Sequence, residues 1–565
     1  MAVILLMAIA VLLAFCCNFN LRNFNRNYIK PLMNETEKLT KYCNESEDTL
    51  NLEMDCYHAR KIRLKCVWDI PGPKRLPFLG TKWIFMIYFW KYKLSKLHDV
   101  YKAVFLLDLN RIYGDIVLEV TPSGIPIVHL FNKSDLEKVL KYPSKYPFRP
   151  PTEIVVTYRR SKPDRYASVG IVNEQGPIWQ KLRSSLTASI TSPRVLQNFL
   201  PALNCVCDDF LDLLKSRRDP RTFEVNNFED IANLLGLEAV CLLMLGRRMG
   251  FLSTKSEQPE KIKQLAAAVK QLFISQRDSY YGLGLWKYLP TKTYREFAKA
   301  EEVIYDVISE MMEQTLATNE ANYHTMHHDG EDQDLRSIFL NILALEELDI
   351  RDKKSAIIDF IAAGIETLAH TLLFVLSSVT SDKQSIEKIL LEFIDYRDSI
   401  ILQDAFTRAT YTKACIQEAY RIRPTAFCLA RILEEDMQLS GYNLKAGTVV
   451  LCENMLACHK DNNFPAALNF QPERWIDKDG KFGVNIESAN LVVPFGIGKR
   501  TCPGKRFVEM EIVLLLAKLI LAFDISFVEP LETEFEFLLA PKAPLRLIMR
   551  DRFYFAFHCQ GFMKI

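Results

Sequence analysis

A single cysteine, Cys502, stands out chemically within residues 494–511, PFGIGKRTCPGKRFVEME. Three glycines and two prolines surround it. Because glycine permits unusual backbone angles and proline fixes them, this composition predicts a shaped loop. The apolar run that follows, residues 512–523, is typical of a helix. Cys502 is therefore expected where a loop meets a helix N-terminus, whose positive end stabilises a thiolate.

A sulfur in this setting indicates iron rather than structural zinc. Structural zinc takes four ligands at close spacing, and the 14 cysteines include no CxxC pair. A lone thiolate can be the single protein ligand of a haem iron. The three glycines of the loop would let its backbone approach a flat macrocycle. Phe495 would pack on the sulfur side, and Arg500 would meet a propionate. A capped, buried cysteine is the alternative.

The loop resembles the FxxGxRxCxG signature of the haem-thiolate monooxygenases, the cytochrome P-450 family. The matching positions are Phe495, Gly498, Arg500, Cys502 and Gly504. The resemblance implies a haem b with the Cys502 thiolate as its axial iron ligand. The haem would be bound non-covalently, because no CxxCH motif is present. It also implies a mainly α fold with a small β part, in which helices enclose the haem.

Two segments before the loop match elements of the same family. EAYR places Glu418 and Arg421 on one helical face, where they can form an ion pair. FQPERW, residues 470–475, resembles the PERF element. The resemblance implies a buried network of Glu418, Arg421 and Arg474 that braces the cysteine loop, and such a network must be fully paired. An ordinary surface helix that carries ExxR by chance is the alternative.

Residues 360–372, FIAAGIETLAHTL, predict a helix that is interrupted at Gly364. An acid and an alcohol follow, Glu366 and Thr367. In an ordinary helix these would be an exposed glutamate and a threonine bonded back to a carbonyl. The segment resembles the family's oxygen-activating turn. That resemblance implies catalytic roles for Gly364, Glu366 and Thr367, with the acid and alcohol relaying protons.

Two further matches concern the haem propionates. In WQKLR, Trp179 and Arg183 stand one helical turn apart and resemble the family's WxxxR element. That element implies a bond from this helix to a propionate. Arg431, which follows the ExxR helix, resembles a second propionate ligand.

The N-terminal region differs in composition from the rest. Residues 2–17 are apolar and would span ~24 Å as a helix, slightly less than a ~30 Å hydrocarbon core. Basic residues follow, and no acid appears before Glu35. This pattern suits a signal peptide, a matrix-targeting leader or a membrane anchor with a cytosolic body. A proline-rich hinge at residues 70–80 then predicts a leader over 1–69 and one haem-thiolate domain over 70–565.

The secondary-structure pattern is mainly helical. Residues 114–131 alternate around a turn signal and predict a β-hairpin. Amphipathic helical patterns cover residues 192–214, 226–244 and 297–317, and short strands are expected over 431–451. The chain contains 71 lysines and arginines against 69 acids. Because binding nucleic acid requires a basic excess, we expect no such partner.

Basic residues near the cysteine loop bear on the electron donor. Lys505 and Arg506 follow the loop, and Lys413 precedes ExxR. They resemble the mitochondrial branch of the family, although Gln417 stands where a second lysine is expected. The resemblance implies docking of an adrenodoxin-type ferredoxin, fed by its reductase and NADPH, at the matrix side of a mitochondrial membrane. The alternatives are an ordinary charged helical turn, and a reticulum-membrane enzyme fed by a flavoprotein reductase.

Two segments give a finer resemblance. Residues 141–179 and 184–204 are similar to arthropod steroid hydroxylases of the mitochondrial branch. This resemblance alone implies that the substrates are ecdysone and O2. A haem isomerase or peroxide-using enzyme is disfavoured by the Glu366–Thr367 pair. A non-catalytic haem sensor or carrier is the remaining alternative.

Overall fold

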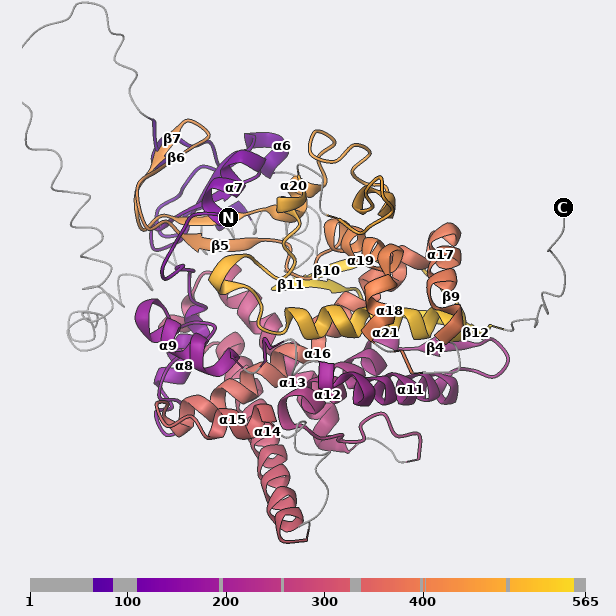
Figure 1. Ribbon diagram of the computed structural model, residues 1–565. Helices are drawn as coiled ribbons and strands as arrows, with labels where there is room; N and C mark the ends of the chain where they lie inside the picture. Colours follow the sequence, from indigo (N-terminus) through magenta and orange to yellow (C-terminus); the bar gives the residue numbers. More distant parts are fainter. Residues whose placement is uncertain are drawn as a thin grey trace, which may run out of the picture.

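The computed structural model describes residues 65–84, 109–188, 190–192, 197–255, 259–325, 337–396, 400–401, 403–483 and 488–552. Nearly all of the leader expected over residues 1–69 lies outside these residues. Long helices make up most of the described chain, and the short strands form several small separate sheets (Figure 1). The expected mainly α fold with a small β part is confirmed.

The helices are α6 Asn110–Tyr113, α7 Lys133–Leu140, α8 Glu153–Arg160, α9 Gly176–Thr187, α11 Leu200–Arg217, α12 Phe228–Leu245, α13 Glu260–Tyr281, α14 Lys292–Thr325, α15 Ser337–Leu343, α16 Ile350–Thr380, α17 Lys383–Phe393, α18 Gln403–Arg408, α19 Thr410–Ile422, α20 Asn454–Cys458 and α21 Lys505–Ala522. Short 3-10 helices are η2 Val67–Asp69, η4 Leu285–Lys287, η5 Ile394–Tyr396, η6 Pro472–Trp475, η7 Ala489–Leu491 and η8 Gly498–Arg500. The strands are β1 Lys65–Cys66, β2 Ile116–Val120, β3 Pro126–Leu130, β4 Glu224–Asn226, β5 Leu429–Ile432, β6 Met437–Leu439, β7 Tyr442–Leu444, β8 Val449–Cys452, β9 Phe523–Phe527, β10 Thr533–Glu536, β11 Leu538–Pro541 and β12 Arg546–Asp551.

The strands form small sheets, the largest in the order β2-β3-β8-β5. β2 and β3 pair antiparallel with Val117 opposite His129, so the expected hairpin is confirmed. β8 pairs parallel to β3, with Val450 opposite Val128. The other sheets are ordered β1-β7-β6, β4-β12-β9 and β10-β11. The strands expected over residues 431–451 are present as β5 to β8.

The helices expected from periodicity are present, with shifted ends. The first of them starts at Leu200 rather than near residue 192. Pro201 lies in its first turn, where the missing proline N–H costs nothing because that group has no intrahelical partner. The other two expected helices correspond to α12 and to part of α14.

α16 is the central helix of the core and packs against α12. Its buried apolar residues include Ile361, Ile365, Leu368 and Leu372, which recur at the spacing of one helical face. Among the described helices, α16 alone is long and apolar enough to cross a membrane. However, 72% of its apolar window is buried inside the protein. That burial is the environment of a core helix.

Glycines let the two central helices approach closely. α16 is helical throughout Ile350–Thr380, so the expected interruption at Gly364 is wrong. Gly364 instead serves packing, because a Cβ there would lie 2.7 Å from Cγ2 of Val240 on α12. A Cβ on Gly236 of α12 would lie 2.5 Å from the carbonyl oxygen of Ile365. Both distances are too short for any side chain, so the contact requires glycine on each helix.

A chain of buried charges ties the hairpin to its neighbours. Lys82 Nζ lies 2.6 Å from Glu119 Oε1, and His129 Nε2 lies 3.2 Å from Glu119 Oε2. His129 Nδ1 lies 2.9 Å from Glu453 Oε1. Burial opposes ionisation of Glu119, but Lys82 and His129 outweigh it and lower its pKa to about 2. Burial likewise opposes ionisation of His129, but Glu119 and Glu453 raise its pKa to about 9.

These shifts predict how stability depends on pH. The His129 pKa is raised from 6.5, so its contribution is complete below pH 6.5 and is lost as pH rises through about 9. The Glu119 pKa is lowered from 4.5, so its contribution is present above pH 4.5 and is lost toward pH 2. We expect the wild-type protein to lose about 1–3 kcal/mol more unfolding free energy than His129→Gln between pH 6 and pH 9. Urea unfolding at both pH values measures this, and parallel losses would contradict it.

Candidate active site

The cysteine loop lies between η8 and α21. The backbone N–H of Cys502 donates to the carbonyl of Phe495 over 2.8 Å, which closes the loop. Gly496 and Gly498 have φ angles of +76° and +70°, a region that side chains rarely adopt. Gly504 caps the N-terminus of α21. The loop is therefore shaped by glycine backbone angles, as its composition predicts.

The Cys502 sulfur lies at the positive end of α21. The residue is exposed, although the neighbouring chain crowds the sulfur closely enough that burial raises the pKa of the thiol. The backbone N–H groups of Gly504 and Lys505 and the guanidinium of Arg183 act in the opposite direction. These groups stabilise a thiolate. The sulfur is therefore suited to bind a metal that holds it in its anionic form.

Four arginines, Arg149, Arg183, Arg431 and Arg500, gather near the loop. Burial lowers the pKa of Arg500 to about 9, and the neighbouring arginines Arg149, Arg431 and Arg183 add to that effect. Burial together with Arg431 lowers the pKa of Arg149 to about 10. None of the four forms an ion pair with a carboxylate of the described residues. A haem has two propionates that would neutralise such a cluster, so the thiolate and the arginines together fit a haem.

The arginines also tie α9 to the loop. Arg183 Nη2 donates to the carbonyl of Thr501 over 2.5 Å. The Arg500 guanidinium lies 3.8 Å from the centre of the buried Trp179 ring. Arg500 also donates to the carbonyls of Pro147 and Glu174. Trp179 and Arg183 of α9 thus contact the adjacent loop residues Arg500 and Thr501.

Arg431, the other residue expected to bind a propionate, lies on β5. Arg431 Nη1 donates to the carbonyl of Ala430, and Nη2 lies 3.5 Å from the carbonyl of Ile497 in the loop. Arg149 was not expected from the sequence. Its signal there is weak, an arginine among prolines in the segment YPFRPP.

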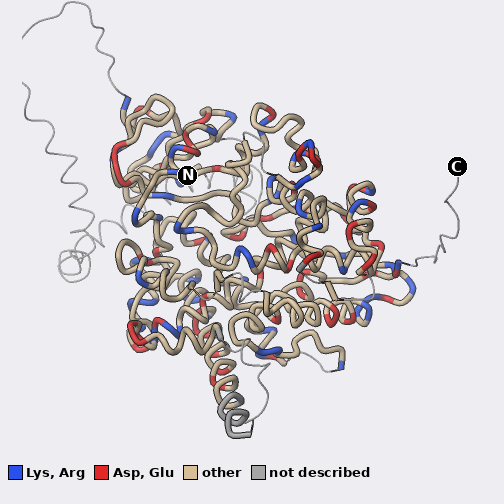
Figure 2. Tube along the Cα trace, in the orientation of Figure 1, with Lys and Arg blue, Asp and Glu red and all other residues tan. Residues whose placement is uncertain are grey.

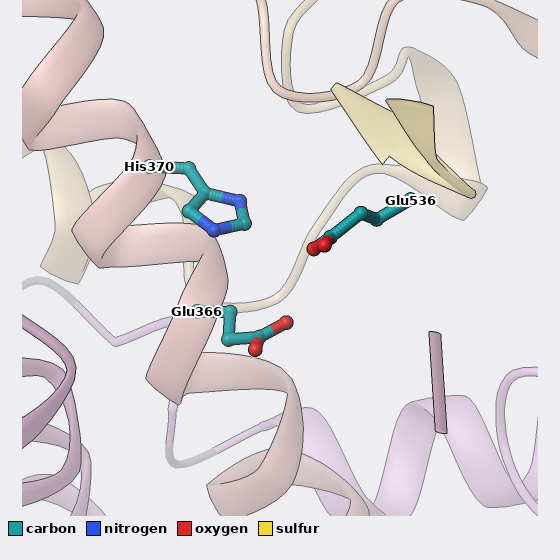
Figure 3. Close-up of side chains that lie close together, drawn as sticks. All are labelled: Glu366, His370 and Glu536. Carbon is teal, nitrogen blue, oxygen red and sulfur yellow. The ribbon is translucent and has the colours of Figure 1, made fainter. Parts of the chain in front are cut away.

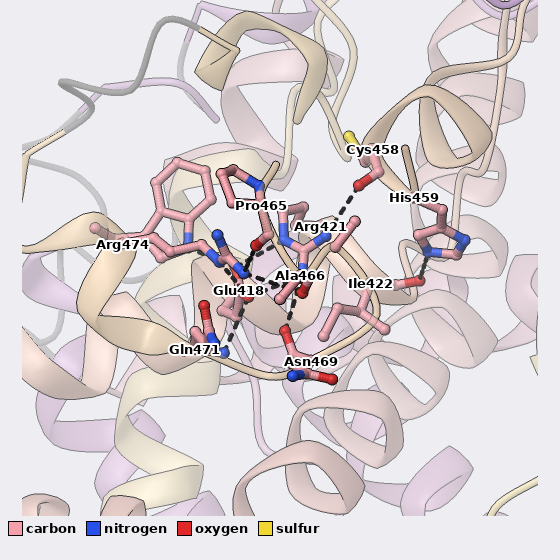
Figure 4. Close-up of polar contacts among 12 residues, drawn as sticks. Glu418, Arg421, Ile422, Cys458, His459, Pro465, Ala466, Asn469, Gln471 and Arg474 are labelled. Carbon is pink, nitrogen blue, oxygen red and sulfur yellow. Dashed lines mark hydrogen bonds and ion pairs between the residues drawn. The ribbon is translucent and has the colours of Figure 1, made fainter. Parts of the chain in front are cut away.

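The structure brings Glu418, Arg421 and Arg474 together (Figure 4). Glu418 and Arg421 are fully buried, and Arg421 Nε and Nη2 each donate to the Glu418 carboxylate over 2.8 Å. Arg474 Nε lies 3.3 Å from Glu418 Oε1. Trp475 Nε1 also donates to Glu418, over 2.9 Å. The buried carboxylate is fully paired, as a charge removed from water requires.

This network reaches the cysteine loop through an aromatic contact. Tyr420, the residue before Arg421, packs edge to face on Phe495 with ring centres 5.5 Å apart. Phe495 is the residue whose carbonyl accepts the Cys502 N–H. The ion pairs therefore fix α19, and α19 supports one side of the loop.

Glu366 and Thr367, the acid and the alcohol of α16, differ in how deeply they are buried. Thr367 Oγ1 donates to the carbonyl of Ala363 over 2.6 Å, and the residue is half-buried. Glu366 is buried, and burial together with nearby Glu536 raises its pKa to about 8, against an opposing effect from Lys270. One donor atom each from Glu366, His370 and Glu536 lies within 4.8 Å of the other two (Figure 3). The i, i+4 spacing of Glu366 and His370 is visible in the sequence, whereas Glu536 is remote from both.

The expected docking residues differ in accessibility. Lys505 and Arg506 are exposed in the first turn of α21, and Arg506 Nη1 donates to the carbonyl of Thr191. Lys413 is partly buried, its Nζ donates to the carbonyl of Phe406, and burial lowers its pKa. Charges of both signs are interspersed over the described chain (Figure 2). The first turn of α21 is therefore the more accessible part of the expected dock.

Comparisons with known proteins agree with this geometry. The cytochrome P-450 family model matches residues 76–549. The chain is 68% identical over 555 residues to an ecdysone 20-monooxygenase of Drosophila melanogaster, covering 98% of this chain and 100% of the relative. A mitochondrial cytochrome P-450 of Drosophila melanogaster is 26% identical over 482 residues, covering 84% and 92%. A cytochrome P-450 of Musca domestica is 27% identical over 466 residues, covering 79% and 85%.

The helical body and the thiolate loop with its arginines are features of a haem-thiolate protein. The chain belongs to the cytochrome P-450 family. It is therefore an oxidoreductase, and the family resemblance seen in its motifs is confirmed.

Proposed function

We propose that the chain is a monooxygenase that uses O2 to convert ecdysone to 20-hydroxyecdysone. The substrate is proposed from one observation, the 68% identity over 98% of this chain to a protein named ecdysone 20-monooxygenase.

The haem-binding roles follow from the charges at the loop. In this proposal the Cys502 thiolate would hold the iron of a haem b, which would supply the chemistry that activates dioxygen. The four arginines would supply the positive charge that binds its propionates, and Trp179 orients Arg500. Residues 70–565 form the single haem domain, and residues 1–69 form a leader that places it at a membrane.

Thr367 and Glu366 are proposed to deliver protons for oxygen activation. Glu366 is the buried acid of the pair, and Thr367 presents a hydroxyl one residue further along α16. Thr367→Ala should retain haem and ecdysone binding but divert reducing equivalents into hydrogen peroxide, because the hydroxyl that positions a proton is lost. The ratio of product to NADPH consumed measures this. We expect that ratio to fall about tenfold or more.

Thr315→Ala is the matched control for this variant. Thr315 Oγ1 donates to the carbonyl of Met311 on α14, the same local bond at a site remote in the sequence from the acid–alcohol pair. It should leave the ratio of product to NADPH unchanged. Equal coupling in Thr367→Ala and the wild type would remove Thr367 from the proton path.

An adrenodoxin-type ferredoxin, reduced by its reductase with NADPH, is the proposed electron donor. The support is the exposed basic turn of α21 and the mitochondrial names of several relatives. The proposed location is the matrix side of a mitochondrial membrane. Arg506→Glu should raise the ferredoxin concentration for half-maximal turnover severalfold, and this effect should shrink at high salt. Arg160→Glu, an exposed arginine on α8, is the control and should leave that concentration unchanged.

NADPH consumption by purified enzyme tests donor and substrate together. Ecdysone should accelerate consumption when ferredoxin and its reductase are present. Consumption supported equally by a flavoprotein reductase alone would place the enzyme in the reticulum branch. A response to another steroid but not to ecdysone would overturn the substrate.

A further inference from the structure

The cluster of Glu366, His370 and Glu536 has a geometry that proton delivery by Glu366 does not explain. Glu366 and His370 lie one turn apart on α16, and Glu536 ends β10. All three are buried, with exposures of 3%, 9% and 4%. Figure 3 shows the imidazole ring and both carboxylates directed toward a common space. Two elements remote in sequence thus converge three donor groups on one point.

The three donors face each other without bonding to each other. One atom from each lies within 4.8 Å of the other two, yet no hydrogen bond joins any pair of these three residues. His370 Nδ1 is buried and has no hydrogen-bond partner. Buried polar groups are normally paired, so an unpartnered imidazole nitrogen beside two buried carboxyl groups indicates room for a further ligand. The one cation that contacts the cluster among the described residues is Lys270 of α13.

We propose that this cluster is a binding site for a divalent transition-metal ion of the zinc type. Zinc takes imidazole nitrogen and carboxylate oxygen at about 2.0–2.2 Å. Tetrahedral ligand atoms are then ~3.4 Å apart, so small rotations of the two glutamate side chains close the cluster around an ion. Three protein ligands leave the fourth position for water. The site requires only these ligands and does not depend on the proposed substrate or electron donor, but Glu366 cannot bind the ion and deliver protons at the same time.

Lys270 of α13 is the competing cation. Its Nζ lies 3.4 Å from Glu536 Oε1, and its side chain is 43% exposed. A partly exposed lysine can turn toward solvent, whereas the three ligands cannot leave the interior. Lys270 therefore opposes the binding of an ion electrostatically, from the side of the cluster where its own side chain reaches solvent. Removing Lys270 and removing a ligand should change metal affinity in opposite directions.

The test is equilibrium dialysis of purified full-length, haem-loaded protein against radioactive zinc and a competing chelator. The wild type should bind one tight equivalent. Glu536→Gln and His370→Asn should weaken that binding by at least about tenfold, since loss of even an outer-shell partner costs that much. Lys270→Met should tighten it severalfold. His459→Asn removes a partly buried imidazole elsewhere, bonded to the carbonyl of Ile422, and should have no effect.

X-ray absorption at the zinc edge identifies the ligands. The expected first shell contains nitrogen and oxygen only. Sulfur in that shell, or equal zinc affinity in all variants, would mean an adventitious ion only, held by the thiols. The absence of bound zinc in the wild type and in every variant would also contradict the proposed zinc site. Tighter binding by Lys270→Met with a first shell of nitrogen and oxygen only supports the site, because zinc held by the exposed thiols of misfolded protein would show sulfur.

Discussion

Cys502→His should abolish the thiolate-type spectrum of the reduced carbon-monoxide complex. Imidazole is a neutral nitrogen ligand, whereas the spectrum reports an anionic sulfur bound to the iron. The Gly504 and Lys505 N–H groups and the Arg183 guanidinium are arranged for a negative sulfur, and they would face a neutral ring instead. Hydroxylation should fall below detection, because the thiolate promotes O–O cleavage.

Cys205→Ser is the matched control, since Cys205 is an exposed cysteine on α11. It should leave the spectrum and turnover unchanged. Haem content is measured in parallel by extraction of the pigment, which separates loss of the ligand from loss of the haem. A thiolate-type spectrum in Cys502→His would require another axial cysteine and would end the assignment.

Among the single substitutions outside the cysteine loop, Glu418→Gln should lower the free energy of unfolding most. Glu418 and Arg421 are both fully buried, and the carboxylate also accepts from Arg474 and Trp475. An amide of the same shape leaves two guanidinium charges uncompensated, at a cost of about 3–5 kcal/mol. Because α19 supports Phe495 through Tyr420, the haem should dissociate before the chain unfolds completely.

Denaturant unfolding, followed by circular dichroism and by haem absorbance, measures both effects. Glu473→Gln is the control on the neighbouring η6, where the side chain is 55% exposed and pairs with Lys388. It should cost less than about 1 kcal/mol, as exposed ion pairs do. Equal losses in the two variants would show that the buried network does not brace the loop.

Local signals in the sequence predicted much of the fold. The hairpin of β2 and β3 follows from two apolar segments that alternate around a turn signal, and the helical patterns follow from apolar periodicity. The predicted ends of the helices were less accurate. Pro201, for example, lies in the first turn of α11, which begins at Leu200 rather than near residue 192. The steric need for glycine at position 364 could not be read locally, since it is set by Val240 on another helix.

The candidate site likewise contains some residues that the sequence predicted and others that only the structure revealed. Cys502 and the Glu418 network lie in motifs with fixed spacing, so their positions could be proposed from the sequence. Arg149 and Glu536 join the site only because the fold brings distant segments together. A lone arginine or glutamate carries no local signal of such a contact.

The most direct test of the central claim is the product formed from ecdysone under oxygen-18 gas. Purified enzyme with ferredoxin, its reductase and NADPH should give 20-hydroxyecdysone with one oxygen-18 atom at carbon 20, detected by mass spectrometry. That result would establish both the monooxygenase chemistry and the substrate. Unlabelled product, or no product from ecdysone while haem and donor are functional, would contradict the account.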